Sequence, residues 1–566
     1  MKNKILSGCI VAVSLLATTS CSDFLTEDPK GKLTPDNYFS NQAELDMSVY
    51  ALYAKVQEYQ CNSNPVIVQC QGDDVTSTTG SNKAAYLSAD AYEVPTDSKG
   101  LNDCWLRSYA IIQASNLIID NAAGAQTTQE EINIALGQAH YWRAFSYFNL
   151  VRVFGPLPMN LHNMPDNNQT PLSSVEDVYA QILSDLQAAE TCNLPTRYTA
   201  TSRAIEGQNV YISAQTVKAT LAAVYMSMAG YPLNKTEMYA QAATKAKEVI
   251  DGVNNGTYPH GLLGDYNEVF SYGNNHHFET LLGIDYNSIP GGWSGWDSQL
   301  SSCHQSGKLG GWGDFLAERR YWKNYPDGPR KDAVYAKQIR LNSGNLVDWW
   351  ATTDGEAYNG ENNAVPDFRP MFIAFSVNDN GGPAAAPYDY AQPFWGGMCI
   401  NKRHQLIRYS EVLCWYAESA ARSNGDLAAA KAALKQVRAR AYNDPAAVQA
   451  VESMDAAQLA EAAYNEHGYE VAGYVLAMVT RRADEFRMNR LKEGYDYRKG
   501  AQNEVLVPAG TLTHSVDAHG NPFSYTLKAD VVAKEEMSVT ASWANDASIY
   551  HNYPPTEVEK NPNLKR

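Results

Sequence analysis

The sequence predicts a mainly α-helical protein, in which a solenoid body of helical hairpins carries a loop-rich, tryptophan-rich variable subdomain. Two hairpins support this prediction, one from Leu406 to Tyr442 and one from Gln215 to Ile250, because apolar residues recur at the helical period in both. The third observation is the stretch 287–393, where glycine, proline, asparagine and tryptophan replace that period. Alanine-rich hairpins leave surface that other hairpins must cover, so we expect several stacked pairs.

The N-terminus has the pattern of a secretion signal. Lys2 and Lys4 form a basic start, Ile5–Ala17 is an apolar run, and Thr18–Ser20 is a small-residue cleavage zone. The apolar run is too short to span a bilayer, which needs about 20 residues. Cys21 directly follows the small residues, as the lipidated cysteine of a bacterial lipobox does, so we predict a lipid anchor there. The alternative is a free secreted protein that is cleaved nearby.

After the signal peptide, 1–20, a first helical region is expected over 21–286. Apolar residues at i, i+3/i+4 and i+7 predict its helices. These are Ala43–Val56, Trp105–Ala122, Glu130–Val153, Ser174–Ala189, Gln215–Ala229 and Met238–Ile250. The polar, threonine-rich stretch Asn64–Pro95 breaks the period, so we predict a loop with short strands. The last two helices resemble a tetratricopeptide unit in their length and small residues.

The variable insertion, 287–393, contains six of the eleven tryptophans and leads into a second helical region, 394–566. The hairpin of that region begins with a helix that has one apolar face, made by Tyr409, Val412, Leu413, Tyr416 and Ala420.

The turn of this hairpin predicts where its helices end and begin. Gly425 is expected to be the glycine with positive φ that follows the first helix, because glycine adopts that conformation without a steric cost. Asp426 is expected to cap the second helix, Leu427 onward, by accepting a backbone hydrogen bond.

Several segments resemble one family. Arg408–Val412, Tyr416–Ala420 and Val437–Ala441 resemble the RYAEVLL…YAEA…VRxRA signature of SusD/RagB-like proteins. Ala139–Pro158, which reads AHYWRAFSYFNLVRVFGPLP, is similar to the family's RAxxYFxLVxxFGxVP segment, and Tyr553–Leu564 is similar to its YPIPxxExxxNPxL segment. These proteins are surface nutrient-binding lipoproteins of Bacteroidetes, and the resemblance covers essentially the whole chain after the signal peptide.

The resemblance implies a function. A protein of this kind captures an oligosaccharide or polysaccharide at the cell surface and delivers it to a SusC-type TonB-dependent transporter of the outer membrane. It implies reversible capture without bond chemistry, so we expect no enzyme activity and no cofactor. Peptide is the main rival cargo, because some relatives bind peptides.

The composition agrees with an uncharged ligand. The formal net charge of −17 repels polyphosphate, which argues against nucleic-acid binding. Charged residues make up only 19% of the chain, whereas there are 36 tyrosines. Aromatic side chains that also form hydrogen bonds suit neutral, hydroxyl-bearing ligands better than ionic ones.

A sugar ring needs flat aromatic platforms and polar groups that satisfy its hydroxyls. Tryptophans in a loop and polar residues of the Asn64–Pro95 stretch offer both, because loops lie on the surface and carry function. The predicted ligand-binding residues are Trp293, Trp296, Trp312, Asp73, Asp74, Tyr86 and Tyr92. The alternatives are that the tryptophans form the core of the insertion and that the two aspartates form a solvated turn or a cation site. In contrast, Trp105, Trp142 and Trp415 lie on predicted helices and are expected in the core.

An enzyme is the weaker alternative. A surface glycan hydrolase needs two carboxylates, and pairs such as Asp484/Glu485 or Glu279/Asp285 arise by chance among 62 acidic residues. The chain contains no GxSxG, HExxH or P-loop motif, and its cysteine spacing matches no zinc template, so no metal site is expected. The sequence leaves open whether Cys61 and Cys70 form a disulfide.

Overall fold

The computed structural model describes most of the chain after residue 37. The described residues are 38–61, 63–77, 83–163, 169–286, 298, 300, 312–336, 338–340, 345–350, 369–375, 388–389, 402–500, 503–533 and 549–565. The predicted signal peptide, Cys21 and much of the insertion lie outside them. None of the described helices is both long and apolar enough to cross a bilayer.

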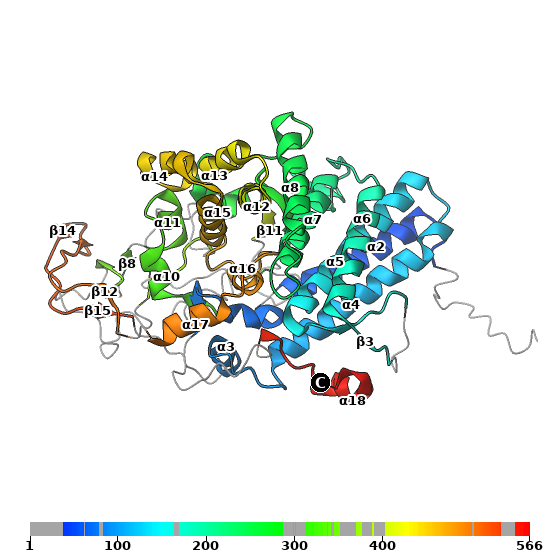
Figure 1. Cartoon of the computed structure of the whole chain (residues 1–566), viewed down its shortest axis with the longest axis horizontal. Coiled ribbons are helices and arrows are strands. Elements are labelled where there is room, and N and C mark those ends of the chain that lie inside the picture. Colours follow the sequence, from blue (N-terminus) through cyan, green and yellow to red (C-terminus); the bar gives the residue numbers. More distant parts are fainter. Residues whose placement is uncertain are drawn as a thin grey trace, which may run out of the picture.

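The described part of the chain is mainly helical, as predicted (Figure 1). The long helices are α2 (Gln42–Gln60), α4 (Lys99–Asn121), α5 (Gln129–Phe154), α6 (Val175–Thr191), α7 (Ala214–Ala229), α8 (Met238–Asn254), α12 (Tyr409–Arg422), α13 (Leu427–Ala441) and α15 (Ala456–Glu470). Shorter helices are α3 (Ala84–Asp90), α10 (Arg319–Asn324), α11 (Pro329–Val334), α14 (Pro445–Gln449), α16 (Arg481–Arg487), α17 (Leu491–Gly500) and α18 (Pro555–Lys560). The 3₁₀ turns include η3 (Asn64–Gln71), η4 (Ala122–Gly124), η5 (Tyr266–Glu268), η6 (Tyr272–Asn274), η8 (Ala450–Ser453) and η10 (Pro562–Leu564).

The long helices pack largely in chain order. Helix α4 lies against α2 and α5, α5 against α6, and α7 against α8. Helix α12 then contacts α8 on one side and both α13 and α15 on the others. Every residue from Tyr409 to Ala421 is therefore buried, including the apolar face predicted from the sequence.

The hairpin of α12 and α13 forms, but two of its details differ from the prediction. Residues 406–408 belong to a strand, because they pair with a second buried strand, and the helix begins only at Tyr409. The residue with positive φ after α12 is Asn424, at 56°, and not Gly425. Asparagine tolerates this conformation, so the turn closes one residue earlier than expected. Asp426 caps α13 as predicted, accepting a hydrogen bond from the backbone N–H of Ala429 at 3.0 Å.

The prediction of loop and short strands over Asn64–Pro95 is only partly right. Residues 64–71 form η3 and 84–90 form α3, and among the described residues of this stretch only Val75–Thr76 is a strand. Most of η3 is buried and packs against α4, so contacts with the rest of the protein stabilise turns that have no helical period of their own.

The described strands are short and mostly paired two by two. Strand β6 (Thr280–Ile284) pairs antiparallel with β11 (His404–Arg408), and both are fully buried. Four small ladders are β1 (Val75–Thr76) with β7 (Leu316–Ala317), β2 (Leu157–Pro158) with β3 (Leu172–Ser173), β4 (Ala204–Ile205) with β5 (Gln208–Asn209), and β12 (Val505–Val507) with β15 (Val531–Val532). One sheet has the order β10 (Tyr388–Asp389), β8 (Gln338–Arg340), β9 (Leu346–Asp348), β13 (Ser515–Val516), β14 (Pro522–Phe523).

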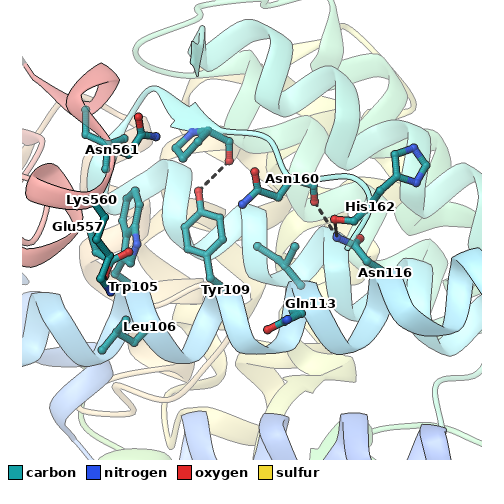
Figure 2. Close-up of a pocket in the computed structure, with 13 residues that line it drawn as sticks. Trp105, Leu106, Tyr109, Gln113, Asn116, Asn160, His162, Glu557, Lys560 and Asn561 are labelled. Carbon is teal, nitrogen blue, oxygen red and sulfur yellow. Dashed lines mark hydrogen bonds and ion pairs between the residues drawn. The ribbon is translucent and has the colours of Figure 1, made fainter. Parts of the chain in front are cut away.

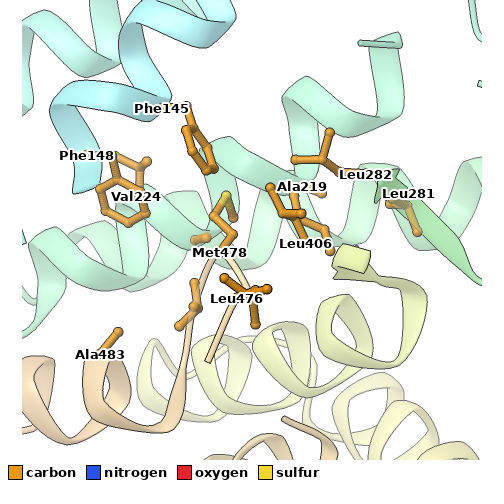
Figure 3. Close-up of a cluster of buried hydrophobic side chains, with 14 of the residues drawn as sticks. Phe145, Phe148, Ala219, Val224, Leu281, Leu282, Leu406, Leu476, Met478 and Ala483 are labelled. Carbon is orange, nitrogen blue, oxygen red and sulfur yellow. The ribbon is translucent and has the colours of Figure 1, made fainter. Parts of the chain in front are cut away.

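The main core lies where the two halves of the chain meet (Figure 3). Phe145 of α5 and Val224 of α7 come from the first half, and Leu406 and Met478 come from the second. All four side chains are at most 2% exposed. The predicted core tryptophans of α4, α5 and α12 are buried as well, which confirms that expectation. The two helical regions are therefore packed on one shared core.

The arginines of the hairpin signature form a buried ion-pair network. Arg408 and Arg440 both contact Oε2 of Glu470, at 2.9 and 3.0 Å. Arg330 of α11 reaches Glu470 and Glu466, both at 2.7 Å. Burial alone would raise the pKa of Glu470, but the three guanidinium groups hold it well below its usual range. The signature thus joins α12, α13, α15 and the insertion.

Three tryptophans of the insertion pack on one another. The ring centroids of Trp322 and Trp349 are 5.0 Å apart, and those of Trp349 and Trp350 are 5.6 Å apart. Trp349 is only 1% exposed. Trp349 is therefore part of a core within the insertion, whereas Trp322 and Trp350 are half-buried beside it.

Candidate functional site

The structure brings the two predicted ligand-binding regions together. Strand β1 of the N-terminal loop pairs with β7 of the insertion, with Val75 opposite Ala317 and Thr76 opposite Leu316. The segment Arg481–Arg498, which holds α16 and α17, packs beside them. We call the meeting of Gly72–Ser77, Trp312–Asn324 and Arg481–Arg498 the junction.

Asp73 is held in the junction by an ion pair. Its carboxylate accepts hydrogen bonds from Nε and Nη2 of Arg481 at 2.7 and 3.0 Å. Its backbone N–H donates to Oε2 of Glu485 at 3.1 Å. This contact positions the carboxylate at one wall of a pocket that is described below, so Asp73 stays a predicted ligand contact.

Asp74 lies inside the protein, only 4% exposed. Its Oδ2 accepts a hydrogen bond from the backbone N–H of Gly473 at 2.7 Å. Burial raises the pKa of Asp74 to about 7, and the neighbouring Asp73 adds to the shift. Burial and Asp73 also raise the pKa of Glu485 well above its usual range. Asp74 and Glu485 therefore carry less negative charge at neutral pH than two ordinary carboxyl groups would.

Tyr86 is also internal. Its hydroxyl lies 2.6 Å from Oγ of Ser63, and its ring meets that of Phe315 edge-on at 5.7 Å. Lys83, three residues earlier, forms a buried ion pair with Asp314. These contacts fasten the N-terminal loop to the insertion, and a ligand contact by Tyr86 stays a prediction.

The remaining predicted aromatic residues have different surroundings. Tyr92 is half-buried, donates its hydroxyl to the backbone oxygen of Gln71 at 2.7 Å and meets the ring of Tyr495 edge-on at 5.3 Å. Trp312 is half-buried and packs against the main core. Trp293 and Trp296 lie outside the described residues, so their roles stay predictions.

A pocket of about 140 Å³ opens in the junction. Its lining combines aromatic rings, two amides and paired charges. It includes Asp73, Arg320, Tyr321, Asn324, Asn465, Tyr469, Arg481 and Tyr497.

Two residues that line this pocket have buried polar atoms that no described residue satisfies. Arg481 and Tyr321 are each 8% exposed, and the Nη1 of Arg481 and the hydroxyl of Tyr321 have no hydrogen-bond partner among the described residues. Both atoms lie beside Gly468, where an added Cβ would come within 2.8 Å of the nitrogen and 3.1 Å of the oxygen. A guanidinium N–H and a tyrosine hydroxyl that lie together can form hydrogen bonds with a hydroxyl group of a ligand or with a water molecule.

The rim of the pocket is aromatic and exposed. Tyr497 is 46% exposed, and its hydroxyl is held by Glu504 at 2.8 Å. The guanidinium of Arg320 lies 5.1 Å from the centre of the Tyr497 ring and is paired with Glu318 at 2.8 Å. Asn324, also exposed, offers an amide beside it. The ring is thus fixed in orientation while part of its surface stays open to solvent.

This arrangement fits a neutral ligand with many hydroxyl groups. The charges lining the pocket are matched, because Arg481 faces Asp73, Arg320 faces Glu318 and Arg498 is paired with Asp90. Exposed rings with amides and matched charges recognise a sugar by its apolar face and its hydroxyls together.

Sequence analysis missed most residues of this pocket. Tyr321, Tyr469 and Tyr497 were not singled out, because each is one of 36 tyrosines and lies in a different segment. Arg481 lies 408 residues from Asp73 in the chain, and no local pattern shows that the two side chains meet.

The acid pairs considered for a hydrolase have internal roles. Asp484 is fully buried and contacts His467 at 2.5 Å and Arg487 at 2.8 Å. Glu279 is fully buried and forms an ion pair with Arg440. Within the described part of the chain, no three histidine, cysteine, aspartate or glutamate residues are grouped as a metal site. Cys61 and Cys70 are buried separate thiols.

Family models match both halves of the chain. A model described as "Starch-binding associating with outer membrane" matches residues 23–226, and one described as "SusD family" matches residues 305–566. A SusD-like protein of Formosa agariphila is 23% identical over 83% of this chain and 88% of its own. A SusD-like protein of Bacteroides ovatus is 22% identical over 75% of this chain and 73% of its own.

Solved structures match over nearly the whole chain. A SusD homolog from Bacteroides thetaiotaomicron has a TM-score of 0.69 and 18% identity, covering 94% of this chain and 97% of that one. A structure with xylogluco-oligosaccharide has a TM-score of 0.65 and 18% identity, covering 92% and 98%. A SusD-like carbohydrate-binding protein from Bacteroides fragilis has a TM-score of 0.66 and 18% identity, covering 93% and 100%. These likenesses show that the fold is that of SusD-like proteins.

Proposed function

The chain belongs to the SusD/RagB family of outer-membrane glycan-binding proteins of Bacteroidetes, and we propose that it captures a neutral oligosaccharide at the junction pocket. SusD family proteins bind their ligands without catalysis, which confirms the expectation that this protein is not an enzyme. Its action is therefore reversible binding of a glycan that leaves chemically unchanged.

The observation that carries this proposal is the convergence of groups in the pocket. Tyr497 offers a partly exposed ring, and Tyr321 and Arg481, which line the same pocket, have polar atoms without a partner among the described residues. A sugar that stacks on the ring and places one hydroxyl at those atoms removes the cost of leaving them buried and unsatisfied.

The relatives suggest which glycans to try first. One structurally similar protein was solved with xylogluco-oligosaccharide, and one family model is described as starch-binding. The matched charges of the pocket favour neutral chains of this kind over uronic acids. Peptide cargo remains the second candidate within the family, and the exposed aromatic rim supports it as well.

The place of action follows the family. A lipid on Cys21, after removal of residues 1–20, would anchor the protein at the outer membrane, with each buried CH₂ contributing roughly 0.8 kcal/mol. The helical regions 21–286 and 394–566 would then dock on a SusC-type TonB-dependent transporter, with the insertion 287–393 near the ligand. Recovery of a large β-barrel protein with this chain from native membranes would support that partner.

The test of glycan capture is calorimetry with recombinant Ser22–Arg566, using xylogluco-oligosaccharide and maltoheptaose. Tyr497→Ala should weaken binding about 10- to 100-fold, because it removes about 1.5–3 kcal/mol of ring burial. Tyr50→Ala is the matched control, since Tyr50 is a comparably exposed tyrosine, 40%, on α2.

Three outcomes are informative. Saturable binding that Tyr497→Ala weakens and Tyr50→Ala leaves unchanged would establish the pocket. Equal affinity of Tyr497→Ala and Tyr50→Ala for the glycan would contradict binding at the junction pocket. Binding of peptides with none of either glycan would move the proposal to peptide capture.

A further inference from the structure

A second pocket lies far from the junction, between α4 and the C-terminal helix α18. Its volume is about 170 Å³, and its third wall is the segment Pro158–Asn160 that follows β2. Figure 2 shows the rings of Trp105 and Tyr109 rising from successive turns of α4, with Gln113 on the following turn at the edge of the helix and with Glu557, Lys560 and Asn561 at one end. We call this pocket the α4–α18 groove. None of the residues that line it also lines the junction pocket.

The floor of the groove is a fixed aromatic pair. The ring centroids of Trp105 and Tyr109 are 4.8 Å apart, with the planes tilted by 42°. Trp105 is only 3% exposed and Tyr109 is half-buried, so Tyr109 offers the more accessible ring. Its hydroxyl donates to the backbone oxygen of Pro158 at 2.8 Å (Figure 2). Beside the pair, Leu106 is 45% exposed and extends the apolar surface.

The walls are rigid, whereas the rim has groups available for a ligand. The Nδ2 of Asn116 donates to the backbone oxygens of Asn160 and His162 at 2.9 and 3.0 Å, which fixes the segment above the floor. Gln113 is exposed and has no hydrogen-bond partner among the residues that the structure describes. Lys560 and Glu557 pair at 2.7 Å, so the rim carries no net charge at that end.

We propose that the α4–α18 groove is a second carbohydrate-binding site, which takes one ring of a neutral oligosaccharide. The apolar face of the sugar would lie against Tyr109 and Leu106. Gln113 can both donate to and accept from its hydroxyls, Lys560 donates, and Glu557 accepts. The groove is smaller than the roughly 300–1,000 Å³ of pockets for drug-sized ligands, so it fits a single ring rather than a longer segment.

A second site changes how a polymer is held. A glycan long enough to reach both sites would bind the second one as an intramolecular event, which strengthens retention without a stronger contact at either site. A short oligosaccharide would occupy each site independently. The groove adds to the proposed function but does not depend on the junction pocket being the main site.

The experiment follows the two leucines of the groove by NMR. Recombinant Ser22–Arg566 with labelled leucine methyl groups is titrated with xylogluco-oligosaccharide and with maltoheptaose, and the signals of Leu106 and Leu564 are recorded. We expect saturable shifts of both signals with at least one glycan. The double variant Gln113→Ala/Lys560→Ala should weaken this binding about tenfold, because it removes two hydrogen-bonding groups.

Two control variants make the result specific. Gln187→Ala removes an exposed glutamine of α6 and should leave the Leu106 shifts unchanged. Tyr497→Ala should also leave them unchanged, so a failure of the junction pocket and a failure of the groove are recognised separately. Absence of shifts with both glycans, shifts that the double variant does not weaken, or shifts produced only by peptides would each overturn the proposal.

Discussion

At the scale of single residues, the buried arginines of the hairpin signature neutralise carboxylates that are closed off from water. Arg440 is 9% exposed and contacts two buried carboxylates, those of Glu279 and Glu470. Arg440→Ala would leave these carboxylates with less compensation in a dry environment. We expect a loss of about 3–5 kcal/mol in the free energy of unfolding, measured by urea denaturation.

The control for this prediction is an exposed ion pair of similar geometry. Arg490 and Glu461 pair at 2.7 Å, with side chains 33% and 44% exposed. Arg490→Ala should cost no more than about 1 kcal/mol, because solvent screens such pairs. Equal losses for the two variants would mean that the buried network has no special role.

Asp74 makes stability depend on pH. Its pKa is raised to about 7 in the folded protein by burial and by Asp73, compared with about 4 in the unfolded chain. The folded state therefore binds this proton more tightly, and the stability from it is complete below pH 4 and is lost as the pH rises through 7. Asp74→Asn should melt at a higher temperature than the wild type at pH 8, with a smaller difference at pH 4.

Thermal unfolding from pH 4 to pH 8 checks this prediction. The backbone hydrogen bond from Gly473 can be kept by the amide oxygen, so the variant should fold. Melting curves of the variant and the wild type that shift in parallel across the whole range would contradict the assignment.

At the scale of elements, the turn between α12 and α13 depends on one backbone conformation. Asn424 has a φ of 56°. This left-handed conformation costs most residues about 1–2 kcal/mol, whereas glycine adopts it freely and asparagine or aspartate adopt it at a smaller cost. Asn424→Ala should lower the free energy of unfolding by about 1 kcal/mol, whereas Asn424→Gly should preserve it. Gly425→Ala is the control and should cost less than Asn424→Ala, since Gly425 has no positive φ. Chemical denaturation measures all the variants.

The elements also show how far local pattern can predict structure. Helix α13 begins where its cap, Asp426, was recognised in the sequence, and α6 begins directly after Ser174, the predicted first residue of that helix. In contrast, the eight residues of η3 were expected to be irregular, because they show no helical period. Burial against the rest of the protein stabilises this turn. Short segments such as this one obtain their structure from their neighbours, and their own residues indicate little.

At the scale of the whole molecule, the two halves of the chain should fold as one unit. The core in Figure 3 joins α5 and α7 of the first half to β11 and the segment before α16. A fragment ending at residue 286 would expose this surface to water. We expect recombinant 22–286 to show weak near-ultraviolet circular dichroism and no cooperative melting, whereas the full chain shows both.

A complementation experiment completes this test. Co-expression of 22–286 with 287–566 should restore a folded complex if the shared core is what the fragment lacks. A fragment 22–286 that melts cooperatively by itself would show that the first half is an independent domain.

The sequence by itself determined the helical body, the central hairpin, the core tryptophans and the family, because these follow from periods and motifs within a few turns of chain. Only the tertiary structure decided that Asp73 meets Arg481, that Tyr497 lies at the rim of the same pocket, and that Lys560 and Tyr109 line a second one. The physical reason is that a binding site is made by contacts between segments hundreds of residues apart. Such contacts leave no period in the sequence, and the burial and charge matching that favour them exist only once the core has formed.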